Sequence, residues 1–191
     1  MNALTLWDLL PGRRSKPASR PTQRKPANLK TTQPRAKKAA ATGMQLRYEQ
    51  ITRQMLSEYG VRVRKWRSSM SGVAWQITYQ DGSISKLIES PKPKGPMSAA
   101  VFLHEIGHHA IGFGTYKPRC LEEYYAWKFS IDKMHELNLN VTDRVHKRMH
   151  DSLNYALEKA ARRGLKRVPQ ELVPYLEPRR SSSHIQRPIA G

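Results

Sequence analysis

The feature that most constrains this chain is the pentapeptide at residues 104–108, which reads H-E-I-G-H and fits the pattern H-E-x-x-H. Residues four apart share one face of an α-helix, so His104 and His108 can direct their imidazoles toward a single metal ion. Glu105 follows the first histidine and can act as the general base for water that the metal activates. The pattern therefore predicts a helix that carries a hydrolytic metal site.

The residues around the motif also favour a helix. Residues 99–103 are apolar and contain no helix breaker. Pro96 and Ser98 are typical of a helix start, and Gly112 is typical of a helix end. The alternative is a surface helix that happens to be rich in histidine. We favour the metal site because the motif and its context agree.

A tetrahedral zinc site that hydrolyses a substrate needs a third protein ligand and leaves its fourth position to water. A short loop with Gly114 and Pro118 follows the motif and can turn the chain back, so a second helix is expected beside the first. That helix offers two adjacent acids, Glu122 and Glu123. Either can also be a solvated first-turn acid that favours the helix dipole. The residues alone leave this choice open.

Residues 123–130 read E-Y-Y-A-W-K-F-S and follow the H-E-I-G-H motif after a short connection. In this arrangement the chain resembles the ImmA/IrrE-type family of small zinc metallopeptidases, which carries H-E-[IL]-G-H and then E-x-x-A-x-x-F-[AS] on the next helix. The resemblance covers roughly the central third of the chain. It implies that His104, His108 and Glu123 bind Zn²⁺ and that Glu105 is the general base.

The chain also departs from this family. Trp127 stands where the family usually has asparagine, and the leucine-methionine-proline run that usually follows the second helix is missing. The connection between the two motifs is unusually short. These departures leave the subfamily and the substrate open, while the resemblance implies a role in DNA damage or in a mobile genetic element.

The net charge and the cysteine content limit which binding partners and which cellular compartment are expected. The 191 residues carry a formal net charge of +19, which favours polyanions such as nucleic acid, an anionic membrane surface or an acidic protein. The single cysteine, Cys120, excludes an intramolecular disulfide framework and fits a reducing compartment. No apolar run is long enough for a transmembrane helix. We expect a cytoplasmic or nucleoid-associated protein, and the arginine-rich, acid-poor beginning leaves organelle targeting open.

We expect three parts along the chain. Residues 1–43 read as a disordered basic tail, with a short apolar motif at 3–10, and residues 178–191 as a disordered C-terminal tail. Residues 44–177 form the predicted domain. The N-terminal tail is interpreted either as a solubilising linker or as an electrostatic tether to nucleic acid. Its candidate phosphate contacts are Arg13, Arg14, Arg24, Lys25, Lys37 and Lys38.

The domain is predicted to be α+β, with a minimal zincin-like plan. A helix over 44–59, with Leu46, Ile51, Met55 and Leu56 as its apolar positions, precedes three strands that form a small antiparallel sheet. Asp81-Gly82 signals a hairpin between the second and third strands. The metal-motif helix and its neighbour follow. A long basic helix over 142–163 comes last.

Other polar residues are weaker candidates. Three tyrosines near the motif could stabilise a developing oxyanion, with no preference among Tyr116, Tyr124 and Tyr125. The side chain of His109 points about 100° away from that of His108 on a helix, so it is not expected to be a ligand. His146 and His150 are four apart but lack an accompanying acid, so we expect solvated histidines.

The sequence therefore predicts a zinc metallopeptidase that hydrolyses a peptide bond in a protein or peptide, with nucleic acid as a further partner through the basic tail. The oligomeric state is not predicted. The alternative is a nucleic-acid-associated binding or regulatory protein whose zinc site is structural or vestigial. The presence of Glu105 distinguishes the enzyme from the binding protein, because a structural site is closed by four protein ligands and needs no general base.

Overall fold

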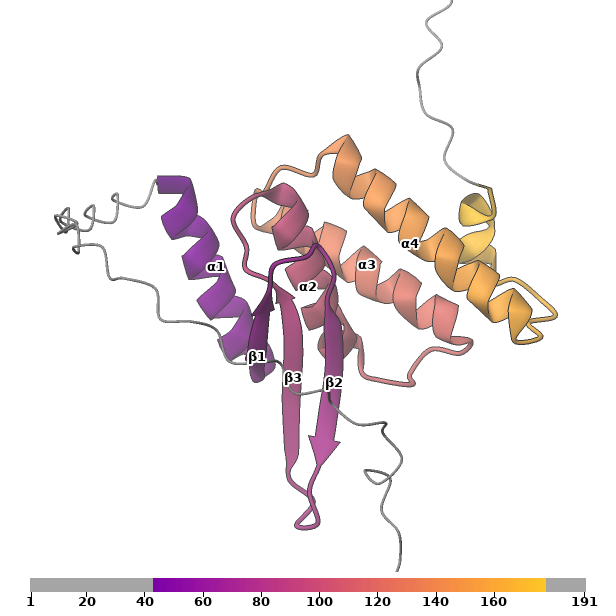
Figure 1. Ribbon diagram of the computed structural model, residues 1–191, viewed down its shortest axis with the longest axis horizontal. Coiled ribbons are helices and arrows are strands. Elements are labelled where there is room, and N and C mark those ends of the chain that lie inside the picture. The colour runs from indigo at the N-terminus through magenta and orange to yellow at the C-terminus, as the bar shows by residue number, and fades with distance from the viewer. Residues whose placement is uncertain (1–42, 178–191) are drawn as a thin grey trace, which may run out of the picture. The chain divides into compact units, whose positions relative to one another are not determined.

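The computed structural model describes residues 43–177 (Figure 1). The predicted tails at 1–43 and 178–191 lie outside this range, apart from Gly43, which begins the first helix. The apolar motif at 3–10 lies outside it as well, and so do the candidate phosphate contacts Arg13, Arg14, Arg24, Lys25, Lys37 and Lys38. These expectations remain predictions.

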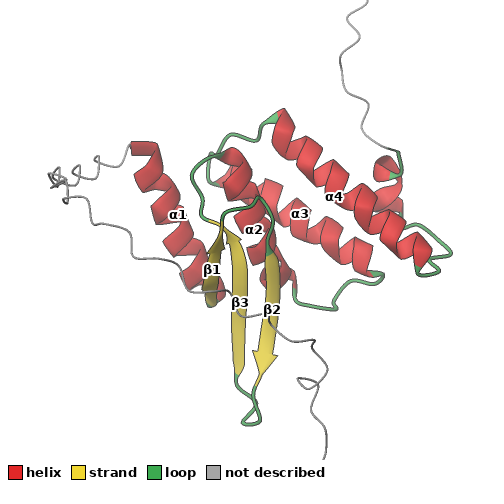
Figure 2. Cartoon of the chain, viewed as in Figure 1, coloured by secondary structure: helices red, strands yellow, loops and turns green. Residues whose placement is uncertain are grey.

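The described residues form an α+β fold with one small sheet (Figure 2). In chain order its elements are α1 (Gly43–Tyr59), β1 (Val61–Arg67), β2 (Val73–Thr78), β3 (Ile84–Pro91), α2 (Pro96–Ile111), α3 (Arg119–Glu136), α4 (Asp143–Arg162) and the 3₁₀ helix η2 (Gln170–Tyr175). The order of elements and the α+β class agree with the prediction.

The sheet is mixed, so the prediction of an antiparallel sheet was wrong. β3 lies in the middle, antiparallel to β2 and parallel to β1. The β2–β3 hairpin turns at the predicted Asp81-Gly82, where Gly82 has a φ of 80°. Alternating residues such as Val61 and Val63 show which face of a strand is buried, but not which strand lies beside it. Residues 68–72 can cross the end of β3, because neighbouring strands are only about 4.8 Å apart.

Helix α2 is the central element, with contacts to the sheet and to the other three α-helices. Every residue from Ser98 to His109 is buried, as expected of a core helix, so the alternative of a surface helix was wrong. Pro96 begins the helix and Gly112, with a φ of 82°, ends it, both as predicted. The Ser98 hydroxyl accepts a hydrogen bond from the Gly95 N–H at 3.2 Å and satisfies a donor at the helix start.

Helix α1 packs one face against α2 and β1. Ile51 and Met55 are buried as predicted, and Tyr48 and Thr52 complete the buried face. Leu46 is 55% exposed, so its predicted place in the core was wrong. It lies before Tyr48, the first buried residue of the helix.

Helix α4 has a sharper division between its faces. Its buried residues recur every four positions, at Val145, Met149, Leu153 and Leu157, and the basic side chains point outward as predicted. Thr142 caps the helix by accepting a hydrogen bond from the Val145 N–H. This stripe attaches α4 to α3 and α2.

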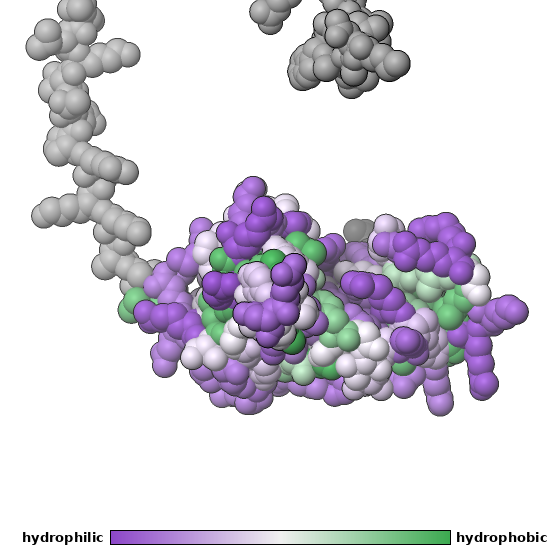
Figure 3. All heavy atoms as spheres, turned by 90° about the horizontal axis from the view of Figure 1, so that it is seen from below, coloured by the Kyte–Doolittle hydropathy of each residue, from purple (hydrophilic) through white to green (hydrophobic). Residues whose placement is uncertain are grey.

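Hydrophilic side chains cover much of the face drawn in Figure 3, with smaller apolar patches between them. This agrees with the low mean hydropathy of −0.70. None of the helices between residues 43 and 177 combines the length and the apolar character that crossing a bilayer requires.

We expect Leu153→Ala to lower the free energy of unfolding by about 2–5 kcal/mol, because it opens a cavity beside a fully buried side chain. Leu46→Ala removes the same atoms from an exposed position and should change stability by less than about 0.5 kcal/mol. Urea unfolding of both variants measures the difference. Equal losses would contradict the assignment of the two faces.

Candidate metal centre

Two neighbouring helices bring three donor side chains together. His104 and His108 lie one turn apart on α2, and Glu123 lies near the start of α3. The Nε2 atoms of both histidines are 3.5 Å from Oε2 of Glu123. Among residues 43–177, these are the side chains grouped closely enough to hold a metal ion. The structure thus unites the two predicted histidines with Glu123.

The glycine within H-E-I-G-H allows the two helices to approach. A Cβ atom at Gly107 would lie 2.8 Å from the carbonyl oxygen of Ala126 and 3.1 Å from the ring of Phe129, both on α3. The hydroxyl of Ser130 donates a hydrogen bond to the carbonyl oxygen of Ala100 at 2.7 Å and joins the helices at a second point, one turn after Ala126 on α3. The close approach of α2 and α3 brings Glu123 within reach of the two histidines.

Glu122 has a different place from Glu123. Its Oε1 lies 3.6 Å from Nδ1 of His108, on the side of the ring away from Glu123. Its Oε2 accepts a hydrogen bond from the Gly114 N–H at 2.7 Å, so the side chain is fixed by the α2–α3 loop. Carboxylates that contact the second nitrogen of a metal-binding histidine fix the orientation of its ring. Glu122 has the geometry of such a supporting residue.

The charges of the three donors depend on one another. Burial lowers the pKa of His104 and keeps this imidazole neutral near pH 7. Burial also opposes ionisation of Glu123, but the two imidazoles outweigh it and hold the pKa of the carboxyl well below its usual range. Burial alone would lower the pKa of His108, yet the carboxylate of Glu123 raises it. These directions favour an ionised Glu123 carboxylate in contact with both imidazoles.

Trp127 packs directly on the centre. Its ring stacks on His104, with centroids 4.4 Å apart and an interplanar angle of 25°. Trp127 is one turn after Glu123, so α3 presents a donor and a flat apolar support to the same histidine. Phe113 lies parallel to the ring of His108, at 6.0 Å. Aromatic packing therefore limits rotation of both imidazoles.

Glu105 is buried beside the start of β2. A Cβ atom at Gly72 would collide with the carboxylate of Glu105, so only glycine leaves room for this side chain. Burial raises the pKa of Glu105 to about 7, although the positive charge of His108 opposes the shift. A carboxyl group with this pKa can accept and return a proton near neutral pH.

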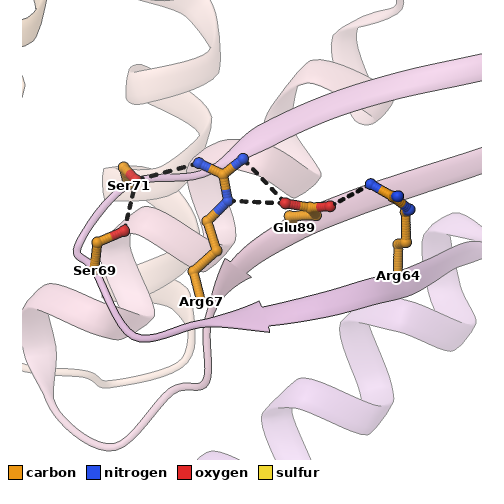
Figure 4. A network of polar contacts seen from close by, with 5 residues as sticks. All are labelled: Arg64, Arg67, Ser69, Ser71 and Glu89. Carbon is orange, nitrogen blue, oxygen red and sulfur yellow. Dashed lines mark hydrogen bonds and ion pairs between the residues drawn. The ribbon is translucent and has the colours of Figure 1, made fainter. Parts of the chain in front are cut away.

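An ion-pair network holds the loop that contains Gly72 (Figure 4). Glu89 on β3 binds Arg64 at 2.6 Å and Arg67 at 3.0 Å, both from β1. Arg67 also donates a hydrogen bond to the hydroxyl of Ser71 at 3.3 Å. The network thus ties the loop after β1 to the central strand, next to the residue that contacts Glu105.

The centre opens into a cleft of about 580 Å³ whose walls come from α2, α3, α4 and the loop before β2. His104, Glu105 and Glu123 all line it. Arg148 on α4 lines it too, and its guanidinium donates a hydrogen bond to the carbonyl oxygen of Met70 at 3.2 Å. Sequence reasoning missed Arg148, because nothing local in the sequence indicates that α4 returns to this cleft.

The three candidate tyrosines do not line this cleft. Tyr116 stacks on Tyr125 at 4.0 Å, Tyr125 donates a hydrogen bond to Glu171, and Tyr124 contacts the ring of Tyr175. They connect the start of α3 with η2, so they are poorly placed to stabilise an oxyanion.

The other histidines lie away from the donor group. His109 has its Nε2 3.1 Å from the carbonyl oxygen of Leu87 and joins α2 to β3. His146 is exposed, as expected of a solvated histidine. His150 packs on Tyr175 and its Nδ1 is buried, so the expectation of a solvated side chain was wrong there. Neither belongs to the group of possible ligands among the described residues.

Comparisons of the chain with known protein families, with curated proteins and with solved structures found no match. The resemblance to the ImmA/IrrE-type family therefore rests on the motifs alone. The side-chain geometry has to support any functional conclusion.

We expect Glu123→Ala to weaken zinc binding more than Glu122→Ala does. Glu123 offers a donor atom, whereas Glu122 supports His108, and loss of such support typically costs about 10–100-fold in metal affinity. Competition with a fluorescent zinc chelator measures both affinities. The assignment of the two acids is reversed if the Glu122 variant loses zinc and the Glu123 variant keeps it.

Glu105 should make the stability of EDTA-treated protein depend on pH. Its folded pKa of about 7 lies above the ordinary value of 4.5, so the folded state binds the proton more tightly. The resulting destabilisation is absent below the ordinary pKa, grows as pH rises, and reaches about 3 kcal/mol above pH 7. Glutamine has no proton to lose, so Glu105→Gln removes this penalty.

Urea unfolding in EDTA at about pH 5 and about pH 8 tests this expectation. From the lower to the higher pH, the wild type should lose about 2–3 kcal/mol relative to the Glu105→Gln variant. The comparison removes the histidine titration that both proteins share, and the measured difference includes the coupling between Glu105 and His108. Parallel pH profiles would show that Glu105 is not desolvated in the folded protein.

Proposed function

We propose that this protein is a zinc-dependent metallopeptidase. The observation that carries the proposal is the grouping of His104, His108 and Glu123 at one end of an open cleft, with the buried carboxyl of Glu105 beside them. Three protein donors and a neighbouring general base are typical of catalytic zinc sites, whereas structural sites are closed by four protein ligands.

The donor set favours zinc. Two imidazole nitrogens and one carboxylate oxygen are the ligands of many hydrolytic zinc sites. Donor atoms that share a tetrahedral zinc at about 2.1 Å lie roughly 3.4 Å apart. The 3.5 Å separations from Glu123 to each histidine support this spacing. Bound zinc would supply a Lewis acid that acidifies water and polarises a carbonyl oxygen.

The side chains of the protein would then perform the other catalytic roles. Glu105 accepts a proton from the attacking water and delivers it to the leaving amine, for which a pKa near 7 is well suited. Arg148 offers a cationic donor at the cleft, where charge develops on the carbonyl oxygen. Glu122 and Trp127 hold the two histidines in place.

The sheet supports a zincin-like plan for substrate binding. β2 is an edge strand, because β3 alone pairs with it among the described residues. Ser71 and Gly72, in the loop just before β2, line the cleft, and Gly72 lies against Glu105. An extended peptide can add to such an edge through main-chain hydrogen bonds. A peptide bound in this way would have one of its peptide bonds next to the metal centre.

We expect Glu105→Gln to retain about one zinc per chain and to lower kcat/KM for peptide hydrolysis by at least about 100-fold, since it removes a base and leaves the ligands intact. Elemental analysis gives the zinc content, and mass spectrometry of a proteome-derived peptide mixture detects cleavage. His104→Ala is the matched control that should lose both zinc and activity.

Two results would count against this function. Absence of zinc from wild-type protein purified without chelators would remove the site. Full zinc occupancy with no cleavage of any peptide, in wild type and Glu105→Gln alike, would favour the alternative of a binding protein with a structural or vestigial zinc site.

A further inference from the structure

The cleft extends well beyond the metal centre along one face of α4. The lining residues along α4 run from Arg148 to Arg163, the C-cap that follows its last residue, a separation of 15 residues and therefore about 22 Å. An extended peptide covers about 3.3 Å per residue, so this wall can contact six or seven residues. Residues at this distance from the reacting bond can determine which peptides bind.

The cleft walls carry an excess of positive charge. Outside the metal centre, their ionic side chains are four basic residues and one acid: Arg119, Arg148, Lys159, Arg163 and Asp151. The acid is already paired, because Asp151 accepts a hydrogen bond from Lys147 at 2.8 Å. Arg119 is paired as well, because its Nε lies 3.7 Å from Oε1 of Glu123. An anionic ligand would therefore meet the remaining positive charge of Arg148, Lys159 and Arg163.

Lys159 and Arg163 stand out within this set. They lie one turn apart, both are exposed, and neither forms an ion pair within residues 43–177. Elsewhere on α4 the same spacing joins opposite charges, as in Arg162 with Glu158. Like charges at this spacing repel each other, and a bound anion between them would relieve that repulsion.

The shape and the other walls of the cleft favour a polypeptide over a nucleic acid. Val101, Ala156 and Leu165 give the cleft apolar surface that suits peptide side chains. At the metal centre, the carboxylates of Glu105 and Glu123 offset the charge of a bound divalent cation, so this part of the cleft has little net attraction for a phosphodiester backbone. A peptide can present neutral backbone there and acidic side chains further along.

We propose that the cleft selects an acidic polypeptide segment, whose carboxylates bind Lys159 and Arg163 while its backbone passes the metal centre. This inference rests on the proposed function for the cleavage step, but the binding preference can be measured without hydrolysis. Charge complementarity sets the preference, so added salt should weaken it.

The test uses full-length, zinc-loaded protein with Glu105→Gln, so that bound peptide is not cut. Fluorescence anisotropy compares three labelled nine-residue peptides in which alanine alternates with glutamate, glutamine or lysine. The glutamate peptide should bind at least about tenfold more tightly than the glutamine peptide. Adding Lys159→Glu and Arg163→Glu should abolish this preference and favour the lysine peptide.

A matched control separates the cleft from general electrostatics. Lys166→Glu with Arg167→Glu makes the same change in net charge within a few residues, at exposed positions that form no ion pair among the described residues and do not line the cleft. This control should keep the preference for glutamate. If it loses the preference equally, the cleft does not determine selection and the inference is overturned.

Three further outcomes are decisive. Equal affinity for the glutamate and glutamine peptides would overturn the inference. A labelled nine-nucleotide single strand that binds more tightly than the glutamate peptide, and depends on Lys159 and Arg163, would replace it with nucleic-acid binding. The expected binding pattern, with no cleavage by the wild-type protein, would support acidic-peptide binding while removing the proposed hydrolysis.

Discussion

The close contact between α2 and α3 at Gly107 is the constraint on which the candidate metal centre depends. A side chain at this position would strike the backbone of Ala126, so the absence of a Cβ sets how near the helices come. Glu123 lies one turn before Ala126 and reaches the two histidines only at this separation. The glycine of the motif thus acts through packing, whereas its histidines and glutamate act through chemistry.

Several polar groups of the candidate metal centre are buried in the core, which is energetically unfavourable unless they are paired. His104, Glu105, His108 and Glu122 are all buried on or beside the central helix. An unpaired buried charge costs several kcal/mol, so mutual contacts must offset part of this cost. Nδ1 of His108 and Oε1 of Glu122 still lack hydrogen-bond partners among the described residues. A bound cation would compensate the remaining negative charge, which couples metal binding to the stability of the fold.

The surface carries many charged side chains, and some of them form ion pairs while others do not. Several basic residues of α3 and α4 pair with acids one turn away, as Lys128 does with Asp132. The cations that remain without such partners include Lys159 and Arg163, which face the cleft. Part of the unpaired positive charge therefore lies where a ligand would enter, which charges spread evenly over exposed ion pairs would not provide. Net charge alone could not distinguish these two arrangements.

The sequence by itself determined those features that depend only on neighbouring residues in the chain. The helix ends at Pro96 and Gly112, the hairpin at Asp81-Gly82 and the periodic apolar stripe of α4 follow from backbone preferences and from side-chain spacing along one element. The spacing of His104 and His108 is equally local, because four residues make about one helical turn. The tertiary structure decided what depends on neighbours: the parallel pairing of β1, the exposure of Leu46, the different places of Glu122 and Glu123, and the return of Arg148 to the cleft. Each requires the relative position of segments distant in sequence, which no periodicity within one segment can specify.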